Sequence, residues 1–348
     1  MQILLARRVF GGRTLLEIVE ILCRIIRTTL LDFKQVHLNY EIGGMLRKHQ
    51  IESYGFHQAL VVGTARNASS NIVVDLLRII DSLDAIVPTL GFVVESDSQD
   101  ATISLLDDLS KSDPRIRFIS LGHIAQQFPD RIARLRHCRN AYVSEIRNNP
   151  VYANCDLVIV ADLDGINTKI NTKHFERALS SEVKWDAIAA NQSARYYDIL
   201  ALRHPLWSPN NWLEQAEWLT PFLGEKAAKR HSMADRMIRI PSDLAPIEVD
   251  SAFGGLCIYR RWVFDECDYS EDIPEAAHEI DHVTLHRKAR MAEGRIFIHP
   301  GLINSNWTAH SLNGSKFIRI SKSLAHTLPF RFSLPILRKL AILLAKQT

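Results

Sequence analysis

The sequence predicts an α/β fold with a mainly parallel central sheet flanked by helices. From residue 58 onward, short apolar strands alternate with amphipathic helices, which is the pattern of a doubly wound sheet. Polar clusters follow several of these strands directly, and ligands on such sheets bind beyond the carboxyl ends of the strands. The chain of 348 residues is long enough for one large domain of this kind.

The individual elements follow from hydrophobic periodicity and length. Strands are expected at residues 59–62, 91–95, 115–120, 157–161, 254–259 and 295–299, and helices at residues 70–83, 100–110 and 130–147. Residues 191–245 contain three tryptophans, several prolines and little clear period, so we expect an insertion there that shapes a pocket. The catalytic domain is placed at residues 55–312.

Both ends of the chain are expected to be helical extensions, at residues 1–54 and 313–348. Residues 1–50 carry eight Lys or Arg against four Asp or Glu, and residues 315–348 carry seven against none. Basic ends on an acidic middle suggest contact with an anionic surface, and the amphipathic tail is compatible with an interfacial membrane helix. Helices packed on the body, or on a second subunit in a homo-oligomer, are the alternatives.

Composition limits the classes of function and location. The net charge of +3 is too small to indicate nucleic-acid binding. The five cysteines form no CxxC pair, which favours free thiols in a reducing compartment. No apolar run is long enough to span a bilayer, and arginines interrupt the first residues, so no signal peptide is expected. We expect a cytoplasmic protein, with peripheral contact at the inner face of the membrane as an option.

The Asp-Leu-Asp sequence at residues 162–164 is the strongest candidate site. It follows four apolar residues that read as a buried strand, and Gly165 comes next. Two carboxylates so placed can hold a hard cation such as Mn²⁺ or Mg²⁺, which would neutralise a diphosphate leaving group. By itself the tripeptide is common, and it could also be a polar corner between a strand and a loop with no function in binding.

Three further clusters occur before or after neighbouring strands. Residues 63–67 read Gly-Thr-Ala-Arg-Asn, residues 95–102 are rich in acids and hydroxyls, and residues 136–141 place two arginines and an Asn on a basic helix. Downstream, paired glycines at residues 254 and 255 let the backbone approach a ligand closely. Each could alone be a cap, a tight bend or a solvated face.

In order and spacing, these motifs resemble the GT-A glycosyltransferases, and more loosely the bacterial and viral capsule-type enzymes, over residues 58–312. The resemblance implies a Rossmann-like GT-A domain that binds a UDP- or GDP-sugar and transfers the sugar to a hydroxyl of a glycan or lipid-linked acceptor. It implies these donor-binding residues: Gly63, Thr64, Ala65, Arg66, Glu95, Asp97, Arg139, Asp162, Gly254 and Gly255.

The resemblance also implies a base and a metal site. Asp281 matches the acid that opens a helix after the glycine pair and removes the acceptor proton, with Glu279 as the alternative. Asp162 and Asp164, with His310 as a C-terminal histidine ligand, would hold Mn²⁺ or Mg²⁺. Tyr197 and Trp207 are candidates for the acceptor pocket, because aromatic faces suit sugar rings. The acidic motif lacks the usual adjacent Glu-Asp, which leaves the base and the stereochemical outcome open.

Two other functions compete with this interpretation. The sequence from His278 to His282 also matches HExxH, in which two histidines bind zinc and Glu279 acts as the base of a hydrolase. That interpretation leaves the strand-end clusters unexplained. A non-catalytic nucleotide-sugar-binding protein would need neither Asp281 nor the paired aspartates.

Overall fold

The computed structural model describes residues 55–271 and 279–306. The expected N-terminal extension, the tail, His278 and His310 therefore lie outside the described residues. The described part contains an eight-stranded mixed sheet in the order β3-β2-β1-β4-β7-β5-β8-β6. The strands are β1 (Ala59–Ala65), β2 (Thr89–Glu95), β3 (Ile116–Ser120), β4 (Leu157–Ala161), β5 (Ala187–Gln192), β6 (Ile247–Val249), β7 (Leu256–Arg260) and β8 (Ile296–Ser305).

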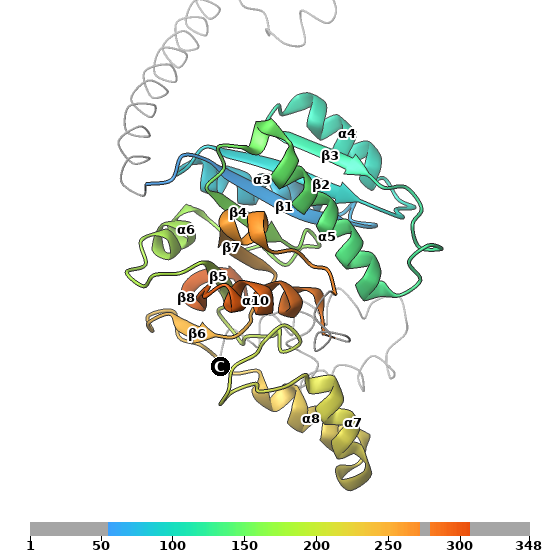
Figure 1. Ribbon diagram of the computed structural model, residues 1–348, viewed down its shortest axis with the longest axis vertical. Helices are drawn as coiled ribbons and strands as arrows, with labels where there is room; N and C mark the ends of the chain where they lie inside the picture. The colour runs from blue at the N-terminus through green and yellow to red at the C-terminus, as the bar shows by residue number, and fades with distance from the viewer. Residues whose placement is uncertain (1–54, 272–278, 307–348) are drawn as a thin grey trace, which may run out of the picture. The chain divides into compact units, whose positions relative to one another are not determined.

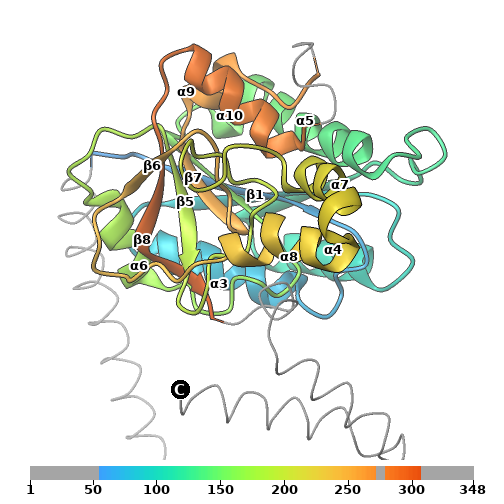
Figure 2. The same ribbon diagram turned by 90° about the horizontal axis from the view of Figure 1, so that it is seen from below.

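Helices cover both faces of the sheet, as Figures 1 and 2 show. The helices α3 (Ile72–Asp84), α4 (Thr102–Ser112) and α6 (Thr172–Leu179) lie on one face. The other face carries α5 (Arg131–Asn148), α9 (Trp262–Glu266) and α10 (Asp281–Met291). The predicted α/β class with a central sheet between helices is confirmed.

Strand direction determines which residues meet at one edge of the sheet. Strands β3, β2, β1 and β4 are mutually parallel, whereas β7 runs antiparallel to both β4 and β5. The start of β7 therefore lies beside the end of β4, and Leu256 pairs with Ala161. This reversal brings the glycine pair before β7 next to the Asp-Leu-Asp sequence after β4.

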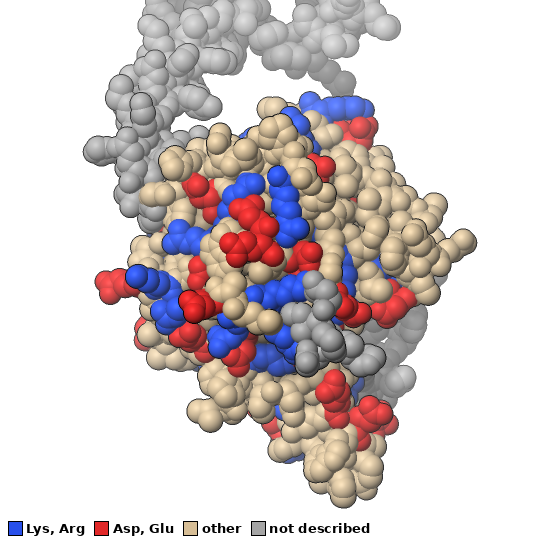
Figure 3. Space-filling view, viewed as in Figure 1, with Lys and Arg blue, Asp and Glu red and all other residues tan. Residues whose placement is uncertain are grey.

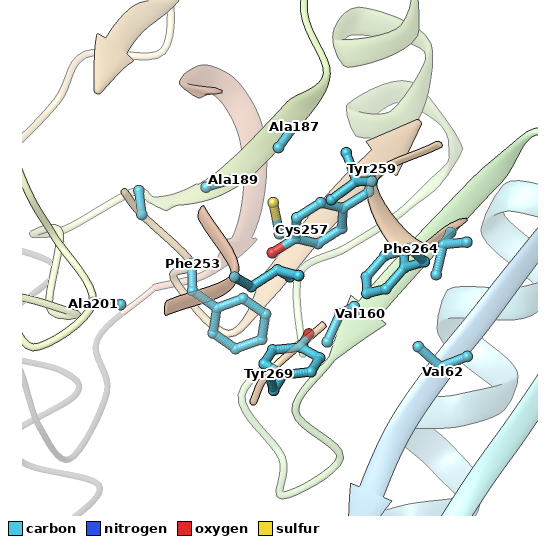
Figure 4. Close-up of a cluster of buried hydrophobic side chains, with 14 of the residues drawn as sticks. Val62, Val160, Ala187, Ala189, Ala201, Phe253, Cys257, Tyr259, Phe264 and Tyr269 are labelled. Atoms are coloured by element: carbon cyan, nitrogen blue, oxygen red, sulfur yellow. The ribbon is translucent and has the colours of Figure 1, made fainter. Parts of the chain in front are cut away.

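The core beneath this edge is apolar and closely packed. Val62, Val160, Cys257 and Tyr259 are at most 2% exposed, and Figure 4 shows the side chains of the central strands packed together with the ring of Phe264. The four cysteines of the described part are buried and free, as expected from the sequence.

The segment 191–245 contains structure that the periodicity does not reveal. After β5 it forms a loop, then α7 (Trp212–Leu223) and α8 (Glu225–Ser232), joined at Gly224. A short 3-10 helix, Ala234–Arg236, follows α8. A second one in the described part, Pro150–Tyr152, lies elsewhere, between α5 and β4. Residues Tyr197 to Ala201 of the loop line a cavity, as do Trp212, Met233 and Met237, which fits the expected pocket-shaping role.

Candidate active site

A cavity of about 490 Å³ lies at the edge of the sheet where β1 and β4 end. Its walls come from the ends of these strands, the loop after β5, the residue before the glycine pair and the start of α10. The polar side chains that line it are Thr64, Arg66, Arg131, Arg139, Asp162, Asp164, Tyr197, Asp198, Asp281 and His282. Sequence segments far apart in the chain thus meet around one space.

Hydrogen bonds from the start of helix α3 hold the Asp-Leu-Asp loop in place. The backbone N–H of Gly165 donates to Asp75 (2.6 Å), and the side-chain amide of Asn71 donates to the carbonyl of Asp164 (3.1 Å). Gly165 has φ of 94°, which favours glycine. These bonds leave the carboxylate of Asp164 exposed at the cavity. The loop therefore presents its acid to a ligand while its backbone is held.

Glycines allow the loop and the cavity wall to approach each other. A Cβ on Gly63 would lie 2.7 Å from the side chain of Leu163, and one on Gly255 would lie 2.9 Å from the hydroxyl of Tyr197. Gly254 and Gly255 have φ of 68° and 82°. Gly63, Gly254 and Gly255 are not among the residues that line the cavity, and their lack of a side chain allows this close packing.

Buried side-chain amides hold the glycine pair in place. The amide of Asn304 donates to the carbonyl of Gly254 (2.8 Å) and to Asn167 (2.9 Å), and Asn167 donates to the carbonyl of Asp162 (2.7 Å). Gln192 donates to the carbonyl of Gly254 as well (3.0 Å). Because buried polar groups need partners, this network fixes β4, β7 and β8 relative to one another. Sequence reasoning did not identify it; its signal is a set of amides within apolar strand patterns.

Arg139 on α5 connects two of the acids. Its Nε lies 3.2 Å from Oδ2 of Asp281, and its Nη2 lies 3.9 Å from Oδ1 of Asp162. The guanidinium also lies over the ring of Phe253, 5.7 Å from the centroid. Burial alone would lower the pKa of Arg139, but nearby groups, Asp281 foremost, raise it above its ordinary value. The arginine therefore remains charged.

Four carboxylates surround the cavity with this one buried arginine between two of them. Loss of water raises the pKa of Asp162 to about 7, against the lowering effect of Arg139 and with the negative charges of Asp164, Asp198 and Asp281 adding to the rise. The Asp162 side chain is 38% exposed and lines the cavity. Burial also raises the pKa of Asp198, whose carboxylate accepts from the N–H of Gly254 (2.9 Å).

This charge balance fits a cation at the cavity. Carboxylate oxygens are the ligands that Mn²⁺ and Mg²⁺ prefer, and a cation would relieve the repulsion at Asp162. Within residues 55–271 and 279–306, no group of three or more His, Cys, Asp or Glu side chains could hold a metal ion alone. Asp162 and Asp164 therefore offer part of a ligand set, which a diphosphate and the predicted His310 would extend.

Asp281 begins α10 at the cavity. Its Oδ1 accepts from the backbone N–H of His282 (2.9 Å), and its buried Oδ2 makes no hydrogen bond within the described residues and faces Arg139. The side chain is 7% exposed. The ion pair with Arg139 and the hydrogen bond at the start of α10 together fix the orientation of the Asp281 carboxylate.

Two of the predicted donor-binding acids, Glu95 and Asp97, bond to the protein itself. Glu95 is fully buried, accepts from the N–H of Ser98 (2.9 Å) and bonds to the hydroxyl of Ser120. Asp97 is 5% exposed and accepts from the N–H of Ala125 (2.9 Å). Neither lines the cavity, because these acids bond instead to the backbone N–H groups of Ser98 and Ala125 and to the hydroxyl of Ser120.

Trp207 also lies away from the cavity. Its indole N–H donates to the carbonyl of Arg236 (2.7 Å), and its ring packs edge-on against Tyr196, with centroids 5.6 Å apart. It packs against the core rather than forming an acceptor wall. Ala65 is buried next to Thr64 and Arg66, which do line the cavity.

Glu279 faces a second cavity, of about 550 Å³. Its carboxylate pairs with Arg203 (2.5 Å) and Arg287 (3.5 Å). Glu279, the alternative candidate for the base, thus lies in a different cavity from Asp162 and is paired with two arginines.

The contacts of the histidines argue against the zinc interpretation. Nε2 of His282 contacts the guanidinium of Arg139, and His286 bonds through its two nitrogens to the hydroxyls of Ser251 and Tyr259 (both 2.9 Å). Burial, followed by the charge of Arg139, lowers the pKa of His282 well below its ordinary value. With Glu279 paired to two arginines as well, the members of the HExxH sequence that the structure describes are not arranged as a metal ligand and a base.

Comparison with known proteins gives structural similarity alone. No protein-family model matches the sequence, and no curated protein is significantly similar to it. Solved structures of glycosyltransferases are similar to the chain.

A mannosyltransferase from Pyrobaculum calidifontis, in complex with GDP-Man and Mn²⁺, is 13% identical over 85% of this chain and 76% of its own, with a TM-score of 0.42. Glucosyl-3-phosphoglycerate synthase from Mycobacterium tuberculosis, in complex with UDP, is 14% identical over 75% of this chain and 73% of its own, with a TM-score of 0.36. At such scores, the assignment of roles rests on the residues of this chain.

Proposed function

We propose that this protein is a metal-dependent glycosyltransferase that moves a sugar from a nucleotide diphosphate sugar to a hydroxyl of a glycan or lipid-linked acceptor. The observation that supports this most directly is the meeting of Asp162, Asp164 and Asp281 in one cavity, connected by the buried Arg139. A metal-dependent transfer of this kind requires metal-binding carboxylates, which Asp162 and Asp164 offer directly after β4, and a fixed carboxylate, which Asp281 offers at the start of α10.

In this proposal the two halves of the cavity have different tasks. Asp162 and Asp164 hold Mn²⁺ or Mg²⁺, which supplies charge neutralisation to the diphosphate. Thr64 and Arg66, at and directly after the end of β1, line the same cavity beside the end of β4 and contact the nucleotide. Arg139 lies between Asp162 and Asp281 and adds a fixed positive charge near the donor.

Asp281 is the proposed base. Its carboxylate faces the cavity and is held by Arg139, so it can accept the proton of an acceptor hydroxyl as the new bond forms. Tyr197 and Asp198 line the wall nearby and are the proposed acceptor-side residues. Close packing of Gly255 against the Tyr197 hydroxyl keeps this part of the cavity wall in position.

Binding of the nucleotide tests this proposal without knowledge of the acceptor. The melting temperature would be measured with UDP, GDP and ADP, each with Mn²⁺ and with EDTA. We expect either UDP or GDP to raise the melting temperature with Mn²⁺ but not with EDTA. The Asp164→Ala variant should show no such rise. Equal shifts in EDTA, or a response to Zn²⁺ without any nucleotide, would contradict the proposal.

A further inference from the structure

The end of the α7–α8 hairpin exposes large apolar side chains. Trp218, Phe222 and Leu223 are 67%, 71% and 50% exposed, and the rings of the first two lie 5.3 Å apart. Helix α7 buries none of its residues. Because apolar surface in water is costly, clustered exposure of this kind marks a contact surface. We call these three residues the apolar tip.

The hairpin joins the apolar tip to the candidate active site. Figure 1 shows α7 and α8 packed against each other and extending away from the sheet, and the far end of the hairpin is mostly free of charged side chains on the face seen in Figure 3. At the other end, Trp212 begins α7 and Met233 follows α8, and both line the 490 Å³ cavity. Whatever binds the tip is therefore brought near the cavity.

We propose that the apolar tip inserts into the interfacial region of a lipid bilayer, and that the acceptor is held in that bilayer; the second part rests on the proposed function. Aromatic side chains are enriched at membrane–water interfaces, and helices bind there by burying an apolar face in the headgroup and acyl boundary. Trp218 and Phe222, one helical turn apart, form such a face.

The size and shape of the tip favour a bilayer over a second copy of the chain. A stable protein interface buries roughly 800 Å² on each partner, whereas two partly exposed aromatic rings and one leucine offer only a few hundred Å². A projecting end is suited to insertion into a fluid surface, which needs no matching groove.

Charge around the tip is almost balanced. Glu217 and Glu225 oppose Lys226, and all three are exposed. Binding through the tip is therefore governed by apolar burial, and it should persist in salt and on uncharged lipid. This distinguishes it from the contact expected of the basic chain ends, which needs anionic lipid.

Vesicle sedimentation of the full chain tests the inference. Phosphatidylcholine vesicles are used, since the basic chain ends gain little from uncharged lipid. We expect the Trp218→Ser/Phe222→Ser variant to bind ~10-fold or more weakly than the wild type, with no fall in melting temperature because both side chains are exposed. Met291→Ser is the matched control: Met291 is 72% exposed on α10, and its loss should not change binding.

Three results would overturn the inference: no binding by the wild type, equal binding by the double variant, or an equal loss with Met291→Ser. A wild-type dimer that the double variant converts to monomer in sedimentation velocity, without any effect of vesicles, would assign the tip to a subunit interface instead. Vesicle binding needs no donor turnover, so failure of the glycosyltransferase proposal and failure of this inference are distinguishable.

Discussion

The Nε of Arg139 lies 3.2 Å from a carboxylate oxygen of Asp281, within a site where both side chains are 7% exposed. One comes from the middle of α5 and the other from the first residue of α10. The pair therefore ties helix α5 to the proposed base at the start of α10.

Removal of this arginine should weaken both the fold and the reaction. Arg139→Met leaves Asp281 buried without a counter-charge, which typically costs about 3–5 kcal/mol. We expect a clear fall in the free energy of unfolding by urea titration. Lys111→Met, which breaks an exposed pair with Asp107, should change it little. Similar losses in the two variants would show that the buried pair is not a structural link.

Loss of Asp164 should affect activity while the fold is retained. Its side chain is exposed, and its hydrogen bond within the described residues is made by the backbone carbonyl, which accepts from Asn71. We expect Asp164→Ala to lower Mn²⁺-dependent donor turnover by at least ~100-fold, a loss of the size produced when a group that stabilises transition-state charge is removed, with an unchanged melting temperature. Asp243→Ala, at an exposed position elsewhere, should retain full turnover. Normal activity of the first variant would remove Asp164 from the metal site.

Two glycines allow backbone strain to be separated from close packing. Gly254 and Gly224 have φ of 68° and 74°, but a Cβ on Gly254 would lie 2.5 Å from the carbonyl oxygen of Ala190, whereas one on Gly224 meets nothing within 4 Å. Strain at such φ costs about 1–3 kcal/mol in both, and overpacking typically adds about 1–3 kcal/mol at Gly254. We expect Gly254→Ala to be the more destabilising in urea titrations; equal effects would contradict the close approach.

His286 should make stability depend on pH. Burial lowers its pKa to about 3, against about 6.5 in the unfolded chain. Below pH 6.5 the unfolded chain binds a proton that the folded chain does not, so stability is lost as pH falls from about 6.5 toward 3, by up to about 1.4 kcal/mol per pH unit. The His286→Gln variant keeps a hydrogen-bond partner for Ser251 or Tyr259, and it should not lose stability in this way as the pH falls.

The stability advantage of the wild type over His286→Gln should therefore shrink between pH 8 and pH 5. Denaturant titrations at a series of pH values measure it directly. A constant difference across this range would show that the histidine is not held in its neutral form.

The strands β1, β2 and β4 could be predicted because they are buried on both faces and read as continuous apolar runs. Strand β5 was missed because Ala187–Gln192 combines small residues with two amides, and these amides reveal their purpose only through bonds to distant segments. The helices of the hairpin were missed because α7 has no buried face to impose a period.

The meeting of strand-end residues at one edge of the sheet could be predicted from the sequence, but not which of these residues line the cavity. Acids after a strand mark the edge of the sheet, yet the sequence does not show whether they face the cavity, as Asp162 does, or turn inward, as Glu95 does. The difference lies in local backbone bonds, such as that of Glu95 to Ser98. Likewise, the resemblance in sequence favours Asp281 over Glu279, but only the fold places the two acids in different cavities.

Release of nucleoside diphosphate from a panel of UDP- and GDP-sugars tests the central claim most directly. The wild type and Asp281→Asn would be compared with Mn²⁺ and with EDTA, in the presence of glycan and membrane-lipid acceptors. We predict metal-dependent release from at least one donor by the wild type, and strongly reduced turnover with retained donor binding in Asp281→Asn. Absence of release from every donor, or release that is equal in EDTA and in the variant, would contradict a metal-dependent glycosyltransferase.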